Sequence, residues 1–528
     1  MNFNKNLKLA VFLAPTRFIL TGVLLLSQTA LVASDSTHNT QNLADTKDHR
    51  LKEFNQIIDS FLGHNSEIKI CDDETFLRRI YLDLTATLPE VAEIKYFRES
   101  KDPHKREQCI DKLLDSSDFE DYSIMKWCDR LRVKSEFPIR LWPNAVQAYT
   151  RYIEQCQRKN LPYDQFVREL LTASGSNFRH APVNFYRAVS QHNPQGYATA
   201  VALTFLGQRL EQWPKMQQQN FIHWFEYVGL KNTREWKEEI VYFSANLSVS
   251  ERSFTFPDGQ SISLLSSTDP REVLAKWLIK TSPHQLQRNA VNRIWYEMLG
   301  HGLCARIDDL TPEDMKASHP VLQYLESFLL DQQWHTREIV ALIAKSKLYQ
   351  QDLSASKSYP LWAQYKVRRL EAEVIVDILQ QVLGGSENYS SMIPEPFTFI
   401  PREEKSILLC DGSITSRTLE LFGRSPRDTG EIQERNNLPS YGQQLQMLNS
   451  SSILNNIQQC SLLKNRKNAK DFGVAMDYIY LAVLSRTPHS QEKLHLQNYQ
   501  SETKLANNEV MRDLLWALIN CREFIYRH

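Results

Sequence analysis

This chain of 528 residues lacks close cysteine pairs: it has eight cysteines but no Cys-x-x-Cys or Cys-x-x-Cys-His sequence. The spacing excludes zinc, iron–sulfur and c-type haem sites built from such pairs, and we expect no cofactor and no bound metal. We expect mostly buried free thiols with one or two disulfides, whose pairing the sequence does not give. The cysteines are Cys71, Cys109, Cys128, Cys156, Cys304, Cys410, Cys460 and Cys521.

An excess of charge of either sign is also missing. Lys and Arg together number 62, and so do Asp and Glu. Nucleic-acid-binding proteins usually carry a basic excess, so we expect no nucleic-acid partner. The chain has no Gly-x-Ser-x-Gly elbow, His-Glu-x-x-His helix, Walker loop or Gly-x-Gly-x-x-Gly motif, and so no standard catalytic signature. Its apolar content of 42% is ordinary for a soluble globular protein.

The N-terminus has the pattern of a secretory signal. Lys5 and Lys8 precede short apolar runs, and small residues follow at 30–34. We expect a signal peptide over 1–34, cleaved near Ala33 or Ser34. An uncleaved membrane anchor is the alternative, but the run is shorter than the ~20 residues that a span needs. We therefore expect an exported protein of the periplasm or cell surface, without a transmembrane span after cleavage.

Helical periodicity dominates the rest of the chain. We expect a flexible linker over 35–50, an N-terminal helical domain over 51–239 and a C-terminal helical domain over 267–528 with a long loop at 384–440. Between the domains, Phe254 and Phe256 alternate with polar residues and Pro257-Asp258-Gly259 follows, which predicts a β-hairpin within a small β element at 240–266. The predicted fold class is mainly α, with two helical halves joined by a small β-hairpin element.

Individual helices follow from the same periodicity. Asp72 or Asp73 is the expected N-cap of a helix through Leu84, and Gly300 is expected to end a helix that carries the stripe from Leu286 to Leu299. Other predicted helices cover about 104–115, 119–133, 143–158, 163–172, 194–206, 216–229, 361–383, 441–459, 472–485, 489–500 and 507–520.

Three segments together resemble a known family. They are Phe76 to Pro89 (FLRRIYLDLTATLP), Val291 to Trp295 (VNRIW) with the following residues to Pro320, and Phe422 to Arg427 (FGRSPR) with the following residues to Asn449. They are similar to the exported two-domain proteins of Planctomycetes that are named as cytochrome-associated and consist of domains of unknown function 1549 and 1553. The resemblance covers nearly the whole chain after the linker and implies architecture and export, but no reaction.

The chain departs from that family at two places. Many relatives have a Cys/His cluster after Phe205-Leu206-Gly207-Gln208-Arg209-Leu210, where this chain has the segment 211–216 without Cys or His, and His223 follows only later. Relatives often place cysteines near 430–433, where this chain has Gly-Glu-Ile-Gln. Since Glu and Gln do not replace thiolate and imidazole as soft-metal ligands, we interpret both places as a degenerate metal site.

The first candidate site contains Arg293, Asp308, Asp309 and His319. Two carboxylates and a histidine suit a hard cation or acid–base chemistry. The structural alternative has one aspartate capping a helix, the other solvated, and His319 at a helix start before Pro320. Arg293 suits a bound carboxylate or sugar, but we favour a buried ion pair with an acid such as Asp308.

The second candidate site is the charged group Arg424, Arg427, Glu434, Arg435 and Asn449. Arginine forks suit anionic ligands, and the alternative is an interlocking structural salt-bridge network. An aromatic run is a candidate sugar platform, although its helical spacing favours a place in the core. It consists of Trp213, Trp224, Phe225 and Tyr227.

These patterns leave the function unknown and three hypotheses open. We favour a non-catalytic binding or assembly protein with a protein or glycan partner, which lacks the Cys/His cluster of its relatives. One alternative is an enzyme or accessory factor of extracellular polysaccharide breakdown, because the resembling family occurs in lineages rich in exported glycan degradation. The other is a redox or haem protein, which the missing ligands disfavour.

Overall fold

The computed structural model describes residues 48–62, 68–245, 250–280, 284–304, 306–311, 313–314, 318–464 and 471–528. The chain divides into two units, Met1–Gln56 and Ile57–His528, and the features below belong to the second. The predicted signal lies outside the described residues, and helical structure begins at residue 48, inside the predicted linker. Within the described ranges, no helix is both long and apolar enough to cross a bilayer.

The first half is helical, as the periodicity predicts. Asp72 is the N-cap of its first helix, where its carboxylate accepts the N–H of Thr75 at 2.8 Å. The helices are α2 (Asp73–Leu84), α3 (Val91–Glu99), α4 (Lys105–Leu114), α5 (Ser117–Arg130), α6 (Pro143–Arg158), α7 (Tyr163–Thr172), α8 (Asn184–Arg187), α9 (Pro194–Val201), the short helical turns Ala181–Val183 and Leu210–Gln212, and α10 (Lys215–His223).

The end of the first half differs from the prediction. Instead of one helix over 194–206, α9 is followed by a π-helical segment, Ala202–Leu206, which Gly207 ends at φ 64°. The predicted helix at 216–229 stops after His223, because Trp224 turns its indole N–H to the carbonyl of Thr255 at 2.9 Å and the chain then enters a strand. Tertiary contacts therefore override the local helical spacing.

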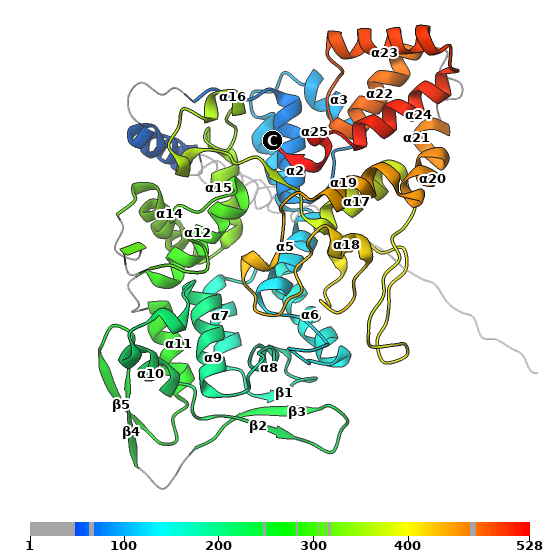
Figure 1. Ribbon diagram of the computed structural model, residues 1–528. Helices are drawn as coiled ribbons and strands as arrows, with labels where there is room; N and C mark the ends of the chain where they lie inside the picture. The colour runs from blue at the N-terminus through cyan, green and yellow to red at the C-terminus, as the bar shows by residue number, and fades with distance from the viewer. Residues whose placement is uncertain are drawn as a thin grey trace, which may run out of the picture. The chain divides into compact units, whose positions relative to one another are not determined.

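Small antiparallel sheets lie between the two helical halves. Strands β1 (Gly175–Ser176), β3 (Glu239–Phe243) and β2 (Val228–Asn232) form one sheet in the order β1-β3-β2. The predicted hairpin consists of β4 (Glu251–Thr255) and β5 (Ser261–Leu265), with Phe254 opposite Ile262 and Gly259 at φ 90° in the turn. In Figure 1 these strands lie beside α8 to α11. The fold is therefore mainly α with small β elements in the middle, as predicted.

The second half is helical again. Its elements are α11 (Pro270–Lys280), α12 (Gln285–Leu299), α14 (Pro320–Asp331), α15 (Thr336–Lys345), α16 (Leu353–Ser356), the turn Leu361–Ala363, β6 (Arg368–Arg369), α17 (Ala372–Leu383), the turn Ser406–Leu408, α18 (Arg417–Leu421), the turn Ile432–Glu434, α19 (Tyr441–Asn449), α20 (Ser451–Gln459), α21 (Ser461–Lys464), α22 (Phe472–Leu484), α23 (Ser490–Thr503), α24 (Asn507–Ile519), α25 (Arg522–Ile525) and β7 (Tyr526–Arg527).

The predicted long helix at 361–383 is wrong in its first part. Residues Arg368 and Arg369 are extended because they pair with β7 at the C-terminus, and only Ala372–Leu383 is helical.

The loop at 384–440 is present, and parts of it are packed. Asp377 of α17 accepts the backbone N–H groups of Ser406 and Ile407, and its burial raises the pKa of that carboxyl to about 6.

Buried arginines of α2 join the beginning of this unit to its end. Arg78 donates to the carbonyls of Val483 and Phe524 at 2.9 and 3.0 Å, and Arg79 donates to those of Tyr349 and His528 at 2.7 and 3.0 Å. Figure 1 shows α2 next to the C-terminal α25. Helix α2 therefore supports the last residues of the unit.

Asp83 of α2 is the centre of this arrangement. Its side chain is fully buried and accepts the phenolic O–H groups of Tyr349 and Tyr365, both at 2.8 Å, and a guanidinium N–H of Arg527 at 3.0 Å. Arg368 lies 3.5 Å from the same carboxylate. Because it is cut off from water, this carboxylate needs all of these donors to be in place around it.

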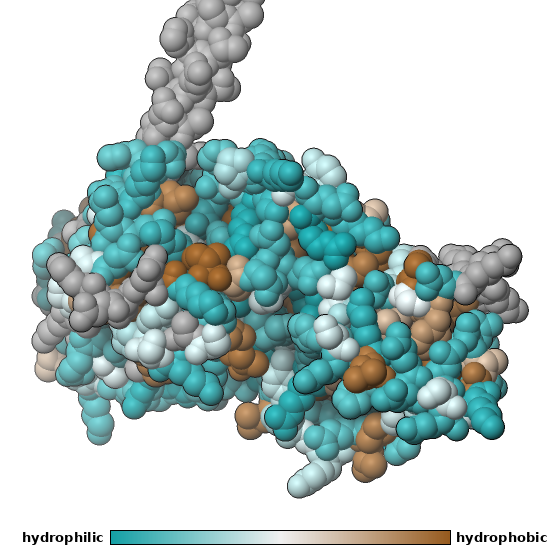
Figure 2. Space-filling model, turned by 90° about the horizontal axis from the view of Figure 1, so that it is seen from above, coloured by the Kyte–Doolittle hydropathy of each residue, from teal (hydrophilic) through white to brown (hydrophobic). Residues whose placement is uncertain are grey.

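The surface of the unit contrasts with this polar interior. The face shown in Figure 2 is mainly hydrophilic, and its hydrophobic side chains form small separate groups. Scattered apolar side chains of this kind are normal on a folded protein.

The substitution Asp83→Asn tests the role of this carboxylate. It keeps the volume but removes the charge, so we expect it to lower the free energy of unfolding by about 3–5 kcal/mol, since it leaves buried cations without compensation. Urea denaturation measures the difference. The matched control is Asp118→Asn, at an exposed partner of Lys405, which we expect to change stability by less than about 0.5 kcal/mol. Equal denaturation midpoints for D83N and the wild type would contradict this role.

Candidate functional site

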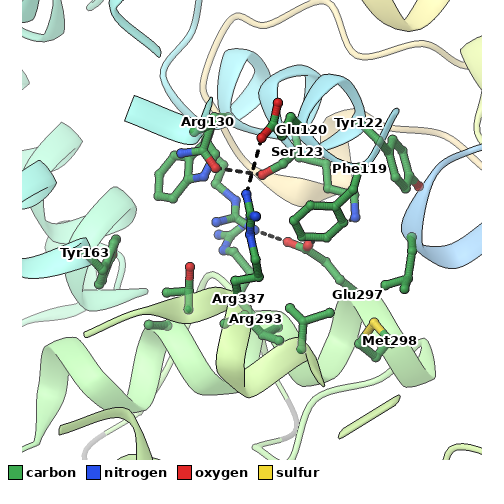
Figure 3. A pocket seen from close by; sticks show the side chains of 18 of the residues that line it. Phe119, Glu120, Tyr122, Ser123, Arg130, Tyr163, Arg293, Glu297, Met298 and Arg337 are labelled. Carbon is green, nitrogen blue, oxygen red and sulfur yellow. Dashed lines mark hydrogen bonds and ion pairs between the residues drawn. The ribbon is translucent and has the colours of Figure 1, made fainter. Parts of the chain in front are cut away.

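A cavity of about 80 Å³ lies between α5, α12 and α15. Figure 3 shows the side chains of Arg130, Arg293 and Arg337 reaching its middle from these helices, with Glu120 and Glu297 facing them. Aromatic rings form further parts of the wall, from Phe119, Tyr122, Trp127 and Tyr163. The cavity is therefore a charged space with partly aromatic walls.

Glu297 is the acid at the centre of this cavity. One carboxylate oxygen pairs with Arg130, and the other lies 3.3 Å from the ammonium group of Lys126. Lys126 also lies 3.9 Å from the centre of the Tyr122 ring. Burial lowers the pKa values of both cations, and Glu297 partly offsets this. Burial alone raises the pKa of Glu297, but the neighbouring cations outweigh it and lower that pKa. Two cations therefore share one carboxylate.

Arg293 forms the predicted buried ion pair with Asp308. The other oxygen of Asp308 accepts the backbone N–H of Ile432 at 2.6 Å, so the pair links α12 to the long loop. Asp308 is therefore neither a helix cap nor a ligand facing solvent. The Nε atom of Arg293 is buried and has no hydrogen-bond partner within the described part of the chain. Because Arg293 lines the cavity, one edge of its guanidinium group is free for a ligand.

A second cavity of about 140 Å³ shares one wall with the first. Both are lined by Lys126, Arg130, Arg293 and Glu297, and the second also by Gly430, Glu431 and Ile432 of the long loop. A side chain at Gly430 would clash, because a Cβ there would lie 2.6 Å from the carbonyl oxygen of Arg130. The loop therefore lies directly against α5.

The two places where the chain departs from the resembling family are close together in space. Arg209, next to the segment 211–216, forms an ion pair with Glu431 at 2.6 Å. Gly207 accepts the backbone N–H of Leu310 at 2.8 Å, close to the Arg293–Asp308 pair. Among the described residues, no three His, Cys, Asp or Glu side chains are placed to share a metal ion. An ion pair joins the two segments here.

The second candidate site is an interlocking salt-bridge network, as its structural alternative predicted. Arg427 and Arg435 bind opposite oxygens of Asp129 at 2.8 and 2.6 Å, and Arg435 and Arg424 both bind Glu373, at 2.6 and 3.2 Å. Burial raises the pKa of Glu373, but Arg435 and Arg424 outweigh it and lower that pKa to about 2. The network joins α5, α17 and the long loop.

The other members of that candidate group are not in the network. Glu434 accepts the backbone N–H groups of Asp428, Thr429 and Gly430 at 3.1, 2.7 and 3.3 Å, so it shapes the loop turn. Asn449 is exposed at the end of α19. The prediction that Glu434 and Asn449 belong to the charged group is therefore wrong.

Asp309 and His319 do not join Asp308 in one site. Asp309 pairs with Arg306 at 2.9 Å. His319 is the N-cap of α14, as predicted, and its ring lies 4.8 Å from the centres of both Phe61 and Trp362. Burial lowers the pKa of His319, which favours the neutral ring. The hypothesis of a shared cation or acid–base site is therefore wrong in its geometry.

The aromatic run lies mainly in the core. Trp224 and Phe225 are fully buried, and the Trp224 ring stacks on Phe256 at 4.7 Å, so the predicted core place of these residues is confirmed. Cys128 and Cys410 interact with each other, and this interaction raises the pKa of Cys128 and lowers that of Cys410. All eight cysteines are unbridged in this structure.

Sequence reasoning missed Lys126, Arg130 and Glu297. The available signal was spacing: Lys126 and Arg130 are four residues apart on α5, and Arg293 and Glu297 are four apart on α12. Such pairs lie on one helix face. The spacing does not show that these two helix faces meet, because only tertiary packing places α5 against α12.

Fold and site define an α-helical protein of two domains with charged cavities at the contact between its halves. The family model "Protein of unknown function (DUF1549)" matches residues 39–221, and "Protein of unknown function (DUF1553)" matches residues 270–500. The chain belongs to the proteins that combine these two domains, which confirms the resemblance. No curated protein and no solved structure matches it.

The substitution Glu373→Gln tests the salt-bridge network through pH. The folded pKa of Glu373, about 2, is below its ordinary value of 4.5, so the network contributes stability above pH 4.5 that is lost as the pH falls towards 2. We expect E373Q to be less stable at pH 7 by about 3–5 kcal/mol. We expect this gap to shrink by about 3 kcal/mol on acidification. Denaturant titrations at several pH values measure it.

The matched control is Glu226→Gln, at an exposed partner of His223. It is expected to show a small gap at every pH. A gap between E373Q and the wild type that stays constant down to pH 3 would exclude the proposed origin of the low pKa.

Proposed function

We propose that this protein is an exported, non-catalytic binding protein that takes up a small oxyanion in the cavity between α5 and α12. The observation that carries the proposal is the Nε atom of Arg293, which is buried in a cation-rich lining and has no hydrogen-bond partner among the described residues. Lys126, Arg130 and Arg337 line the same cavity, and Lys126 and Arg130 share the carboxylate of Glu297. Charge-assisted hydrogen bonds from such donors suit a small anion.

The size and the donors of the cavity support a small ligand. Its volume of 80 Å³ has room for phosphate, sulfate or a short carboxylate together with a few water molecules. The free Nε of Arg293 and the ammonium group of Lys126 are donors for such a group. Arginine holds its proton at neutral pH, so Arg130 and Arg293 suit anion binding rather than proton transfer. The proposed export rests on the signal pattern at 1–34.

Two substitutions with opposite effects test this function. Lys126→Met removes one of the two cations that share Glu297, so we expect anion binding to weaken by at least about tenfold. Glu297→Gln leaves Lys126 and Arg130 without their carboxylate, so we expect a lower Tm in plain buffer and tighter anion binding. The probes are inorganic phosphate, sulfate and acetate, measured by calorimetry and by the Tm shift at increasing anion concentration.

Lys405→Met is the matched control, because Lys405 is an exposed partner of Asp118 on the surface. We expect its anion response to equal that of the wild type. The proposal fails if none of the three anions produces heat or a Tm shift in the wild type and in E297Q. It also fails if K126M responds to them as the wild type does.

A further inference from the structure

Three aromatic rings from distant segments contact one another at the surface on another part of the unit, with Trp142 partly exposed and its ring plane at 85° to that of Trp236. Trp142 precedes α6, Trp236 lies in the turn between β2 and β3, and Phe397 lies in the long loop. The ring centre of Trp142 is 6.5 Å from that of Trp236 and 6.0 Å from that of Phe397. Trp236 is 71% exposed and Phe397 57% exposed, so large ring surfaces face solvent. We call these three residues the aromatic platform.

A cation lies on this platform. The ammonium group of Lys237 is 5.2 Å from the ring centres of both Trp142 and Trp236. Lys237 forms no ion pair with a carboxylate within the described ranges. The rings hold the ammonium group by their quadrupoles and leave it available to a second, charged partner.

The backbone fixes the platform in an unusual conformation. Trp142 has φ 72° and ψ 146°, and Lys237 has φ 63°, in a region that side-chain-bearing residues rarely adopt. Hydrogen bonds hold the turn: Asn177 donates to the carbonyl of Lys237 at 3.1 Å, and Ser176 and Thr233 donate to Glu238 at 2.6 and 2.7 Å. Strain that is held in this way is typical of binding sites.

A basic hollow of about 810 Å³ lies next to the platform, between α6, α7 and the residues 178–182. Arg179 lines it and pairs with Glu235, the neighbour of Trp236, at 3.1 Å, so the hollow and the platform adjoin. Arg151 and Arg168 also line it, and neither forms an ion pair among the described residues. Glu169 is the acid in the lining, and it accepts the O–H of Tyr152.

We propose that the aromatic platform and the adjoining basic hollow form a binding site for an acidic polysaccharide. The C–H faces of sugar rings pack on exposed aromatic rings, and carboxylate or sulfate groups of the polymer pair with the free cations. Trp236 and Trp142 bind the sugar faces, Lys237 binds an anionic group between them, and Arg151 and Arg168 bind the next groups along the chain.

Charge favours this occupant over a nucleic acid, which also stacks on aromatic rings in basic grooves. A nucleic acid has one phosphate for each nucleotide, and the formal net charge of this chain is zero. Lys237, Arg151 and Arg168 are separate cations without an ion pair among the described residues, and such spacing beside an exposed ring surface matches a polymer of sugars with spaced acidic groups more closely.

Affinity electrophoresis and calorimetry test the proposal on the full-length chain. The probes are alginate as a polyuronate, dextran sulfate, neutral dextran and single-stranded poly(dT). We expect alginate and dextran sulfate to bind, and neutral dextran to bind at least tenfold more weakly. Trp236→Ala is expected to weaken binding of the acidic polymers about tenfold. The double variant R151Q/R168Q is expected to weaken it and to reduce its salt dependence.

Tyr96→Ala is the control, since Tyr96 is 77% exposed on α3, away from the platform. Unchanged Tm values show that the variants are folded. The proposal is overturned if W236A binds both acidic polymers as tightly as the wild type, or if neutral dextran binds as well as alginate. Tighter binding of poly(dT) than of both acidic polymers also overturns it and assigns the surface to nucleic acid. Absence of binding to any polysaccharide overturns it as well.

Discussion

The rest of the structure depends on the buried carboxylate of Asp83. It accepts two tyrosine hydroxyls and an arginine that come from more than 260 residues further along the chain. An unpaired carboxylate at this depth would cost several kcal/mol, so α2 is stable in its place only when the second half has folded around it. The two family domains are therefore not independent in this protein: the first supplies the acid, and the second supplies its donors.

The charges around the cavities are also held by partners from other segments of the chain. Glu297 and Asp308 of the second half compensate Arg130 of α5 and Arg293 of α12, and Glu373 compensates two arginines of the long loop. Each charge is fixed by a partner from another segment, so the cavity walls are held before any ligand arrives. Donors that are already in place lower the cost of ordering a site on binding. A small cavity can therefore bind a ligand with few contacts.

Local patterns predicted most of the fold. The helices at 143–158 and 163–172 and the hairpin at Gly259 follow from spacing and turn residues, and the structure has them at those positions. The prediction failed where distant segments pair, as at Arg368, which joins the C-terminal strand. The ion pair of Arg293 was predictable because the alternative is an uncompensated buried charge. The cavity around Glu297 and the platform of Trp142, Trp236 and Phe397 were not, since their members are far apart in sequence and only tertiary packing brings them together.

The two segments that lack cysteine, 211–216 and 430–433, lie close together in the structure. They are about 220 residues apart in sequence, yet Arg209 and Glu431 connect them in space at the edge of the second cavity. The Arg209–Glu431 ion pair holds the long loop against the first half of the chain. A ligand bound by both segments would also hold them together. Ion pairs therefore keep the long loop against the first half without any metal ligand from these segments. Beside them, the buried Nε of Arg293 has no hydrogen-bond partner among the described residues, which is the feature on which the proposed anion site rests.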